Sequence, residues 1–391
     1  MSTVYILGAG FSMPFGYPSS RALLGELNTF ADTLNAVDPE LKATWQRCWK
    51  ELKESKDDAV RCAFEGGNIE ELFTILDFHQ KLVSNRFSDS ANEYFQAKKC
   101  SGKGSVGKEA EDRFQHANAL SDKYTAHRDT LLKVLQAFFL VSHHKDHTKW
   151  SSAKYDDLKR FAQQVQPGDA IVTFNYDALA ERALLDCGKW TPRNGYGFEV
   201  NLESKEDPCT CTAYSPVQVL HLHGFIGWYD GGSAADVSTL DSTFLADLGC
   251  QCKPTDRINH KHVNIIAPSY IKTYVTPNWD GTKIAELWGK AIQAIRCSSR
   301  VVIIGYSLPE ADSAAMTLFL GISGKTVEVV NPEVHIERHI RDMLEGNLLE
   351  PLEPRCTFVY HSTGKFSWEN IPDYNLSSWL NEQEAHETQS S

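Results

Sequence analysis

Short runs of β-branched and other apolar residues recur along the chain and predict buried strands. They lie at residues 4–7, 170–174, 217–222, 263–266, 301–304, 327–330 and 357–360. Most are continuously apolar rather than alternating, as is typical of strands buried on both faces of a sheet. Helical patterns separate several of them, at 177–187, 283–295 and 332–344. Strand alternating with helix predicts an α/β fold built on a doubly wound parallel sheet.

Residues 21–165 differ, because they show helical periodicity almost throughout. Leu23, Leu24, Leu27 and Phe30 form one apolar stripe, and similar stripes follow near residues 69–83 and 131–138. The pattern predicts a large helical domain at 21–165, inserted into an α/β domain that comprises residues 1–20 and 166–391. Residues 98–112 are rich in Gly, Ser and Lys and predict an exposed loop. The polar tail 381–391 is expected to be flexible.

Composition narrows the class of protein. The chain has 391 residues, of which 42% are hydrophobic and 23% charged, as in folded globular proteins. Its net charge of −12 disfavours direct nucleic-acid binding. No apolar run reaches the roughly 18 to 20 residues of a membrane span, and residues 1–7 lack the pattern of a signal peptide. We therefore expect a cytoplasmic protein without membrane contact, whose ten cysteines are reduced thiols.

The first candidate for chemistry is the turn Gly8-Ala9-Gly10, which follows a predicted strand and precedes Ser12. Glycines between a strand and a helix let backbone N–H groups come close to a phosphate. A Rossmann fingerprint has a third glycine where this chain has Met13. By itself, the turn is compatible with either a nucleotide cradle or a tight structural turn.

Polar residues also follow two further predicted strands. Asn175 and Asp177 come after the strand at 170–174, where ligands of open parallel sheets bind. Either residue could instead cap the next helix. His221 and His223 share a face of the strand at 217–222, and a histidine near a core is often only structural. His223, beside a glycine at the strand's carboxyl end, is the better candidate for a base, with His221 as its supporting partner.

Two more strands have the same layout. Gly305 and Ser307 follow the strand at 301–304, and Asn331 ends the strand at 327–330. Capping alone does not readily explain five apolar strands that each end in glycine or polar residues.

These segments, taken in order, resemble the sirtuin superfamily. The carrying motifs are GAGFS at 8–12, FNYD at 174–177, HLHG at 221–224, GYSL at 305–308 and Asn331. The helical insertion and the segments TFNYD, HLHG and IIGYSLPEAD resemble, more narrowly, the prokaryotic sirtuin-like NAD hydrolases associated with antiphage defence. The resemblance implies a sirtuin-like Rossmann variant over about residues 1–20 and 166–345.

The resemblance also implies roles for individual residues. Asn175 would contact the nicotinamide ribose and place a water, Asp177 would hold the nicotinamide amide, and His223 would act as base. The other residues would bind NAD: Gly8, Ala9, Gly10 and Ser12 at the diphosphate, Pro18 in a covering loop, and Gly305, Ser307 and Asn331 at the adenosine.

The implied activity is NAD glycohydrolysis, which yields ADP-ribose and nicotinamide and has NAD as its substrate. Because uncontrolled hydrolysis would kill the host, the resemblance implies gating by a ligand, by homo-oligomer formation or by a regulatory partner protein from the same defence system. The alternatives are an NAD-dependent protein deacylase and a non-catalytic sensor of NAD or ADP-ribose.

Cysteines could supply one further site. Cys209, Cys211, Cys250 and Cys252 form two Cys-x-Cys pairs on either side of the 217–222 strand. Four thiolates could hold a structural zinc ion, but the spacing differs from the Cys-x-x-Cys pairs of zinc-binding sirtuins. Free cysteines in two loops are the favoured interpretation, and we expect no metal in the candidate site.

Overall fold

The computed structural model describes residues 2–36, 38–82, 105–146, 153–199, 201–202, 214–229, 239–240, 263–269, 282–308, 312–319, 322, 324–331, 334–346 and 356–362. The chain divides into two compact units. The sheet unit comprises Met1–Ser19, Phe139–Ile266 and Tyr274–Ser391. The helical unit comprises Ser20–Phe138 and Ala267–Thr273.

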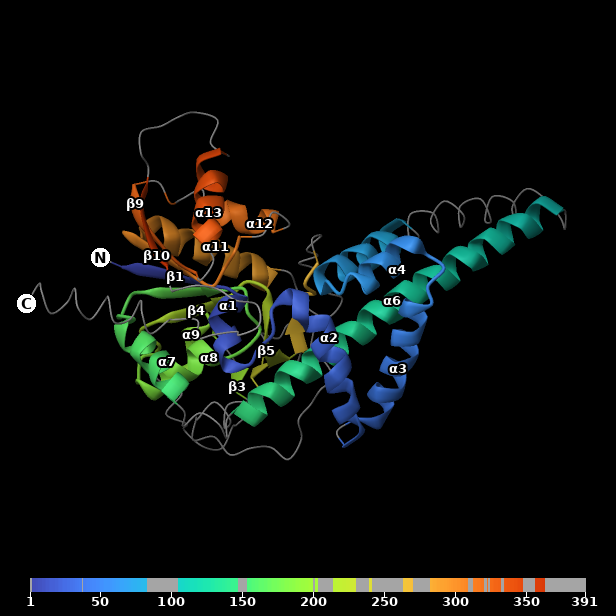
Figure 1. The fold of residues 1–391 in the computed structure, drawn as a ribbon, viewed down its shortest axis with the longest axis horizontal. Coiled ribbons are helices and arrows are strands. Elements are labelled where there is room, and N and C mark those ends of the chain that lie inside the picture. Colours follow the sequence, from blue (N-terminus) through green and yellow to red (C-terminus); the bar gives the residue numbers. More distant parts are fainter. Residues whose placement is uncertain are drawn as a thin grey trace, which may run out of the picture. The chain divides into compact units, whose positions relative to one another are not determined.

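A six-stranded sheet forms the centre of the sheet unit (Figure 1). Its strands are β1 (Thr3–Leu7), β2 (Ala170–Thr173), β4 (Gln218–His221), β8 (Arg300–Ile304), β9 (Lys325–Asn331) and β10 (Cys356–Ser362). All neighbouring strands are parallel, in the order β10-β9-β8-β1-β2-β4. Counted along the sheet this is the strand order 6-5-4-1-2-3 of a Rossmann fold, which reverses between β1 and β8.

The main sheet is apolar because it is covered on both faces. Every residue of β2 is buried, as are the last four residues of β1 and of β8. Figure 1 shows α7 (Ala153–Gln164), α8 (Leu179–Asp186) and α9 (Pro192–Gly195) on one side of the strands. On the other side lie α11 (Thr282–Cys297), α12 (Ser313–Phe319) and α13 (Val334–Gly346). The predicted α/β fold with a doubly wound parallel sheet is confirmed.

A second sheet was not predicted. It has four strands in the order β3-β6-β5-β7, namely β3 (Asn201–Leu202), β6 (Thr239–Leu240), β5 (Gly224–Tyr229) and β7 (Val263–Ile265). The predicted strand at 263–266 is therefore present as β7, but it pairs antiparallel with β5. It is not part of the parallel sheet.

All regular elements described in the helical unit are helices. They are α2 (Ser20–Ala31), η2 (Asp32–Ala36), α3 (Pro39–Lys53), α4 (Asp58–Glu65), a helix at 69–82 and most of α6 (Ser105–Asp146). Two aspartates fix helix starts: Asp38 accepts from Leu41 N–H at 2.8 Å, and Asp57 accepts from Ala59 N–H at 3.0 Å. Such caps satisfy N–H groups that have no partner within the helix.

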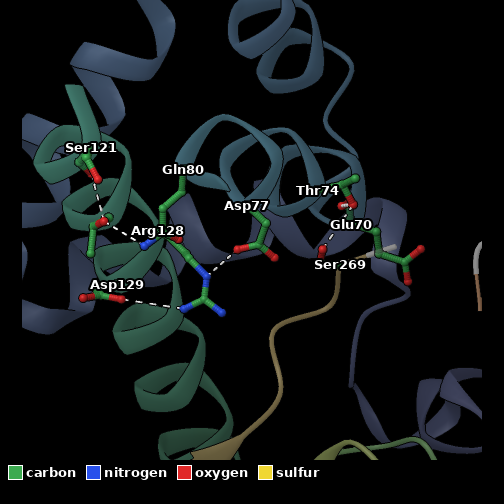
Figure 2. A network of polar contacts seen from close by, with 9 residues as sticks. Glu70, Thr74, Asp77, Gln80, Ser121, Arg128, Asp129 and Ser269 are labelled. Carbon is green, nitrogen blue, oxygen red and sulfur yellow. Dashed lines mark hydrogen bonds and ion pairs between the residues drawn. The ribbon is translucent and has the colours of Figure 1, made fainter. Parts of the chain in front are cut away.

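Polar contacts tie the helix at 69–82 to α6 within this unit. Figure 2 shows Asp77 facing Arg128, whose Nε lies 2.6 Å from Asp77 Oδ1. One turn away, Gln80 Nε2 donates to Thr125 Oγ1 at 2.9 Å. Because Asp77 is only 4% exposed, its charge requires this guanidinium partner.

Two boundaries differ from the sequence expectations. Residues 139–165, expected in the helical domain, belong to the sheet unit, so the division falls within α6. Part of the expected loop at 98–112 is helical, since α6 begins at Ser105. Residues 105–112 contain Lys108, Glu109, Glu111 and Asp112 but no apolar stripe, which is why the sequence pattern did not reveal a helix.

Candidate active site at the carboxyl ends of the strands

The glycine-rich turn after β1 packs against the end of β8. Gly10 N–H donates to Gly305 O at 2.9 Å. A Cβ on Gly8 would stand 2.6 Å from Tyr306 Cα, and a Cβ on Gly305, whose φ is +60°, would stand 2.3 Å from Phe11 N. The close approach of two backbones thus requires glycine here. A phosphate that used the Gly10 N–H would have to displace the Gly305 carbonyl.

Asn175 reaches from the end of β2 to this turn. Its Nδ2 donates to Gly8 O at 2.9 Å and to Ser12 Oγ at 3.0 Å. An amide nitrogen has two hydrogens, and both are used in these bonds. What Asn175 can offer a ligand is therefore its carbonyl oxygen, which accepts a hydrogen bond from a water or a hydroxyl.

Asp177 belongs to the same cluster. Ser12 Oγ donates to Asp177 Oδ2 at 2.6 Å, and Leu179 N–H donates to Oδ1 at 3.1 Å. Burial raises the pKa of Asp177 to about 6; the bonds from Ser12 and Leu179 oppose this rise, and the charge of Glu181 adds to it. Asp177 thus satisfies an N–H at the start of α8 and also bonds to Ser12.

His221 contacts the backbone of Asn175. Its Nδ1 lies 3.0 Å from Asn175 O, and its Nε2 is paired with Glu181 Oε1. The ring is fully buried, with its centroid 4.2 Å from that of Phe225. The sequence predicts His221 as the partner of His223, whereas the two nitrogens of its ring contact Asn175 and Glu181.

His223 lies in an aromatic and acidic surrounding. Its Nε2 is 3.4 Å from Asp312 Oδ2, and Tyr306 Oη donates to the same oxygen at 3.3 Å. The Phe174 ring lies 5.0 Å from the His223 ring and stacks on Tyr306 at 4.4 Å. The imidazole of His223 therefore has a buried carboxylate within ion-pair distance of its Nε2.

The two groups of contacts meet at the end of β2. Phe174 contacts His223, while the next residue, Asn175, bonds to the turn after β1. Gly305 N–H donates to Val330 O at 3.0 Å and so connects the end of β8 to β9.

The remaining candidate residues differ in exposure. Ala9 and Ser307 are exposed, Pro18 is half-buried, and Asn331 is 7% exposed at the end of β9. The cysteines Cys209, Cys211, Cys250 and Cys252 lie outside the described residues. Within the described ranges, no group of three or more His, Cys, Asp or Glu could hold a metal ion. Nor is any helix in the described part of the chain long and apolar enough to cross a membrane.

Two buried carboxylates near the site were missed as functional residues. Glu181 lies on α8, one turn after Asp177, and helical periodicity does not place an acidic residue in the interior. Asp312 ends the segment IIGYSLPEAD, which was noted for its resemblance but without a role for this residue.

Neither a protein-family model nor a curated protein matches the chain. Among solved structures, the chain is similar to one described as Sir2Tm bound to a propionylated peptide, with 13% sequence identity over 88% of this chain and 93% of that chain. The TM-score is 0.26, which is too low to support a shared fold. The strand order described above establishes the fold, and the function is inferred from the residues themselves.

Proposed function

We propose that this protein is an NAD glycohydrolase, which cleaves NAD to ADP-ribose and nicotinamide. The observation that carries the proposal is the bonded cluster of Ser12, Asn175 and Asp177. It joins the carboxyl ends of β1 and β2, next to the position where the strand order reverses. In doubly wound sheets this is the usual place of a nucleotide. The motifs that resemble those of sirtuins contain the same residues.

Asn175 suits the chemistry of this reaction. The bond between nicotinamide and ribose breaks through an oxocarbenium-like state, which requires a fixed ribose and one positioned nucleophile. With both amide hydrogens donated to Gly8 and Ser12, the Asn175 carbonyl oxygen can accept a hydrogen from the attacking water. The amide is neutral, so it orients the water without reacting with the cation.

His223 is the proposed base. Its Nε2 lies 3.4 Å from the carboxylate of Asp312, and the imidazole can take a proton from a ribose hydroxyl or from water. General base catalysis of this kind contributes about 10²- to 10⁴-fold to a rate.

The other candidate residues are proposed to bind the dinucleotide. Asp177 would hold the nicotinamide amide, and Pro18 would lie in the loop that covers it. The diphosphate would lie at Gly8, Ala9, Gly10 and Ser12, and the adenosine at Gly305, Ser307 and Asn331. Diphosphate binding would involve opening the contact between Gly10 and Gly305.

Gating follows from the same resemblance. Free hydrolysis of NAD would deplete the cell, so we propose that a ligand, homo-oligomer formation or a partner protein from an antiphage system controls the activity. The bond from Gly10 N–H to Gly305 O is one contact that activation could change.

The test is nicotinamide release from NAD by the purified chain, over a range of protein concentrations and with candidate partners. We expect Asn175→Ala and His223→Ala to lower turnover at least about 100-fold. Asn118→Ala and His116→Ala, at partly or fully exposed positions of α6 in the helical unit, serve as matched controls and should retain activity.

Other results would favour other functions. Nicotinamide release that requires an acetyl-lysine peptide would identify a deacylase. NAD or ADP-ribose binding, measured by calorimetry, without turnover under any of these conditions would identify a sensor. Either result would contradict the proposed hydrolase.

A further inference from the structure

Glu181 and His221 form a buried pair beside the candidate site. Glu181 comes from α8 and His221 from the end of β4, and both side chains are fully buried. Nε2 of His221 contacts Oε1 of Glu181. Nδ1 of the same ring lies 3.0 Å from the backbone oxygen of Asn175.

The hydrogen-bond partners determine where the protons are. A backbone carbonyl only accepts hydrogen bonds, so Nδ1 of His221 must carry a hydrogen. The contact between Nε2 and Glu181 then holds one further proton, either on the ring or on the carboxyl group. In both cases the pair is neutral overall, as its burial requires.

Aromatic rings enclose the imidazole. The ring centroids of Phe225, Trp228 and Tyr196 lie 4.2, 5.8 and 6.0 Å from that of His221. All three residues are fully buried. A ring packed in this way and bonded at both nitrogens has one orientation, so the Nδ1–H points steadily at Asn175.

Asn175 is therefore held from two neighbouring strands. Its side chain bonds to Gly8 and Ser12 after β1, and its backbone oxygen bonds to His221 on β4. We infer that Glu181 and His221 are positioning residues: they fix the backbone of Asn175, and its amide can then orient the attacking water. This inference rests on the proposed NAD hydrolysis. Glu181 acts by holding the tautomer and orientation of His221.

Two substitutions of His221 separate its two bonds. The Nδ2 atom of Asn is as many bonds from Cα as Nδ1 of His, whereas the Nε2 atom of Gln corresponds to Nε2 of His. His221→Asn can keep the bond to Asn175 and His221→Gln the bond to Glu181. We expect His221→Gln to lower kcat about 10- to 100-fold, with KM for NAD changed less than about threefold. His221→Asn should lose less activity than His221→Gln.

Two substitutions of Glu181, one conservative and one apolar, give a second comparison. Glu181→Gln can donate from its amide to Nε2 of a neutral His221, which keeps the Nδ1–H on Asn175. Glu181→Leu cannot. Turnover per folded molecule should be about tenfold or more higher in Glu181→Gln than in Glu181→Leu. A purely structural pair would change the unfolding midpoint but give equal turnover in all four variants, and this result would overturn the inference.

Hydrogen exchange separates this inference from the proposed function. Exchange at residues 174–178 should become faster in His221→Gln than in His221→Asn. If the wild type releases no nicotinamide while this difference is seen, the proposed reaction fails and the positioning of Asn175 stands. Equal exchange in the two variants would overturn the positioning role, whatever the activity of the wild type.

Discussion

The titration of Asp177 should make the stability of the folded chain depend on pH. Burial raises its pKa from an ordinary 3.8 to about 6, so the folded chain binds this proton more tightly than the unfolded chain. Its contribution to stability is greatest below about pH 4 and is lost as the pH rises through 6. Asp177→Asn has no proton to lose. Between pH 4.5 and 7, the variant should gain about 2 kcal/mol in free energy of unfolding relative to the wild type.

Urea unfolding of both proteins at several pH values measures this difference. Asp169→Asn is a suitable control, because Asp169 is also buried and accepts backbone N–H bonds from Thr3 and Gln166 in the same unit. A parallel pH dependence for the wild type and Asp177→Asn would show that Asp177 does not titrate in this range.

Individual site residues could be predicted where the strand order brings them together. Asn175 and Asp177 follow a buried strand, and any parallel sheet places that end beside the turn after a neighbouring strand. Asn175 and Asp177 lie 163 and 165 positions from Ser12 in the sequence, so the pattern predicted only that these residues lie near one another, and not their hydrogen bonds. Glu181 could not be predicted, because the burial of a helical glutamate depends on a histidine from another strand.

At the scale of elements, continuous apolar runs predicted the parallel sheet well. The runs at 4–7, 170–174 and 301–304 are strands within one residue of the expected bounds. The second sheet was not predicted because three of its four strands carry little pattern. β5 begins one residue after His223, and β3 and β6 have two residues each, which is too short for any periodicity.

Lys325 joins two elements of the sheet unit. From the start of β9, its Nζ donates to Arg296 O at 2.9 Å and also to Ser298 O, at the carboxyl end of α11. A buried ammonium there satisfies carbonyl groups that the helix leaves without partners. Lys325→Met should lower the free energy of unfolding by about 2 kcal/mol, because the carbonyls lose charged hydrogen bonds.

Lys283→Met is the matched control. Lys283 lies on the same helix, α11, and pairs with Glu286 near the surface at 3.0 Å. Surface pairs of this kind contribute about 0 to 1 kcal/mol. Equal losses in the two variants, measured by urea unfolding, would mean that the contacts of Lys325 do not stabilise the end of α11.

For the complete chain, the sequence predicted two units but misplaced the second boundary between them. Helical periodicity continues through α6 and α7, so it gave no sign that residues 139–165 belong with the sheet. The first boundary was clearer, because the pattern changes near residue 20 from a strand and turn to long helices, and the helical unit begins at Ser20.

All eleven candidate site residues lie in the sheet unit. A core substitution in the helical unit should therefore lower stability without lowering turnover. Leu72 is fully buried in the helical unit, and Ile303 is fully buried in β8, two residues before Gly305. Leu72→Ala and Ile303→Ala should each cost about 2 to 5 kcal/mol, since both leave a cavity in a packed core. Calorimetry should show a lowered unfolding temperature for each variant.

Turnover should separate the two variants at a temperature where both remain folded. Ile303→Ala loosens the strand that carries Gly305 against the turn after β1, so nicotinamide release should fall about tenfold. Leu72→Ala should stay within about twofold of the wild type, because no candidate residue lies in its unit. If Leu72→Ala remains folded and loses turnover as Ile303→Ala does, the helical unit takes part in the reaction, and the site cannot be assigned to the sheet unit alone.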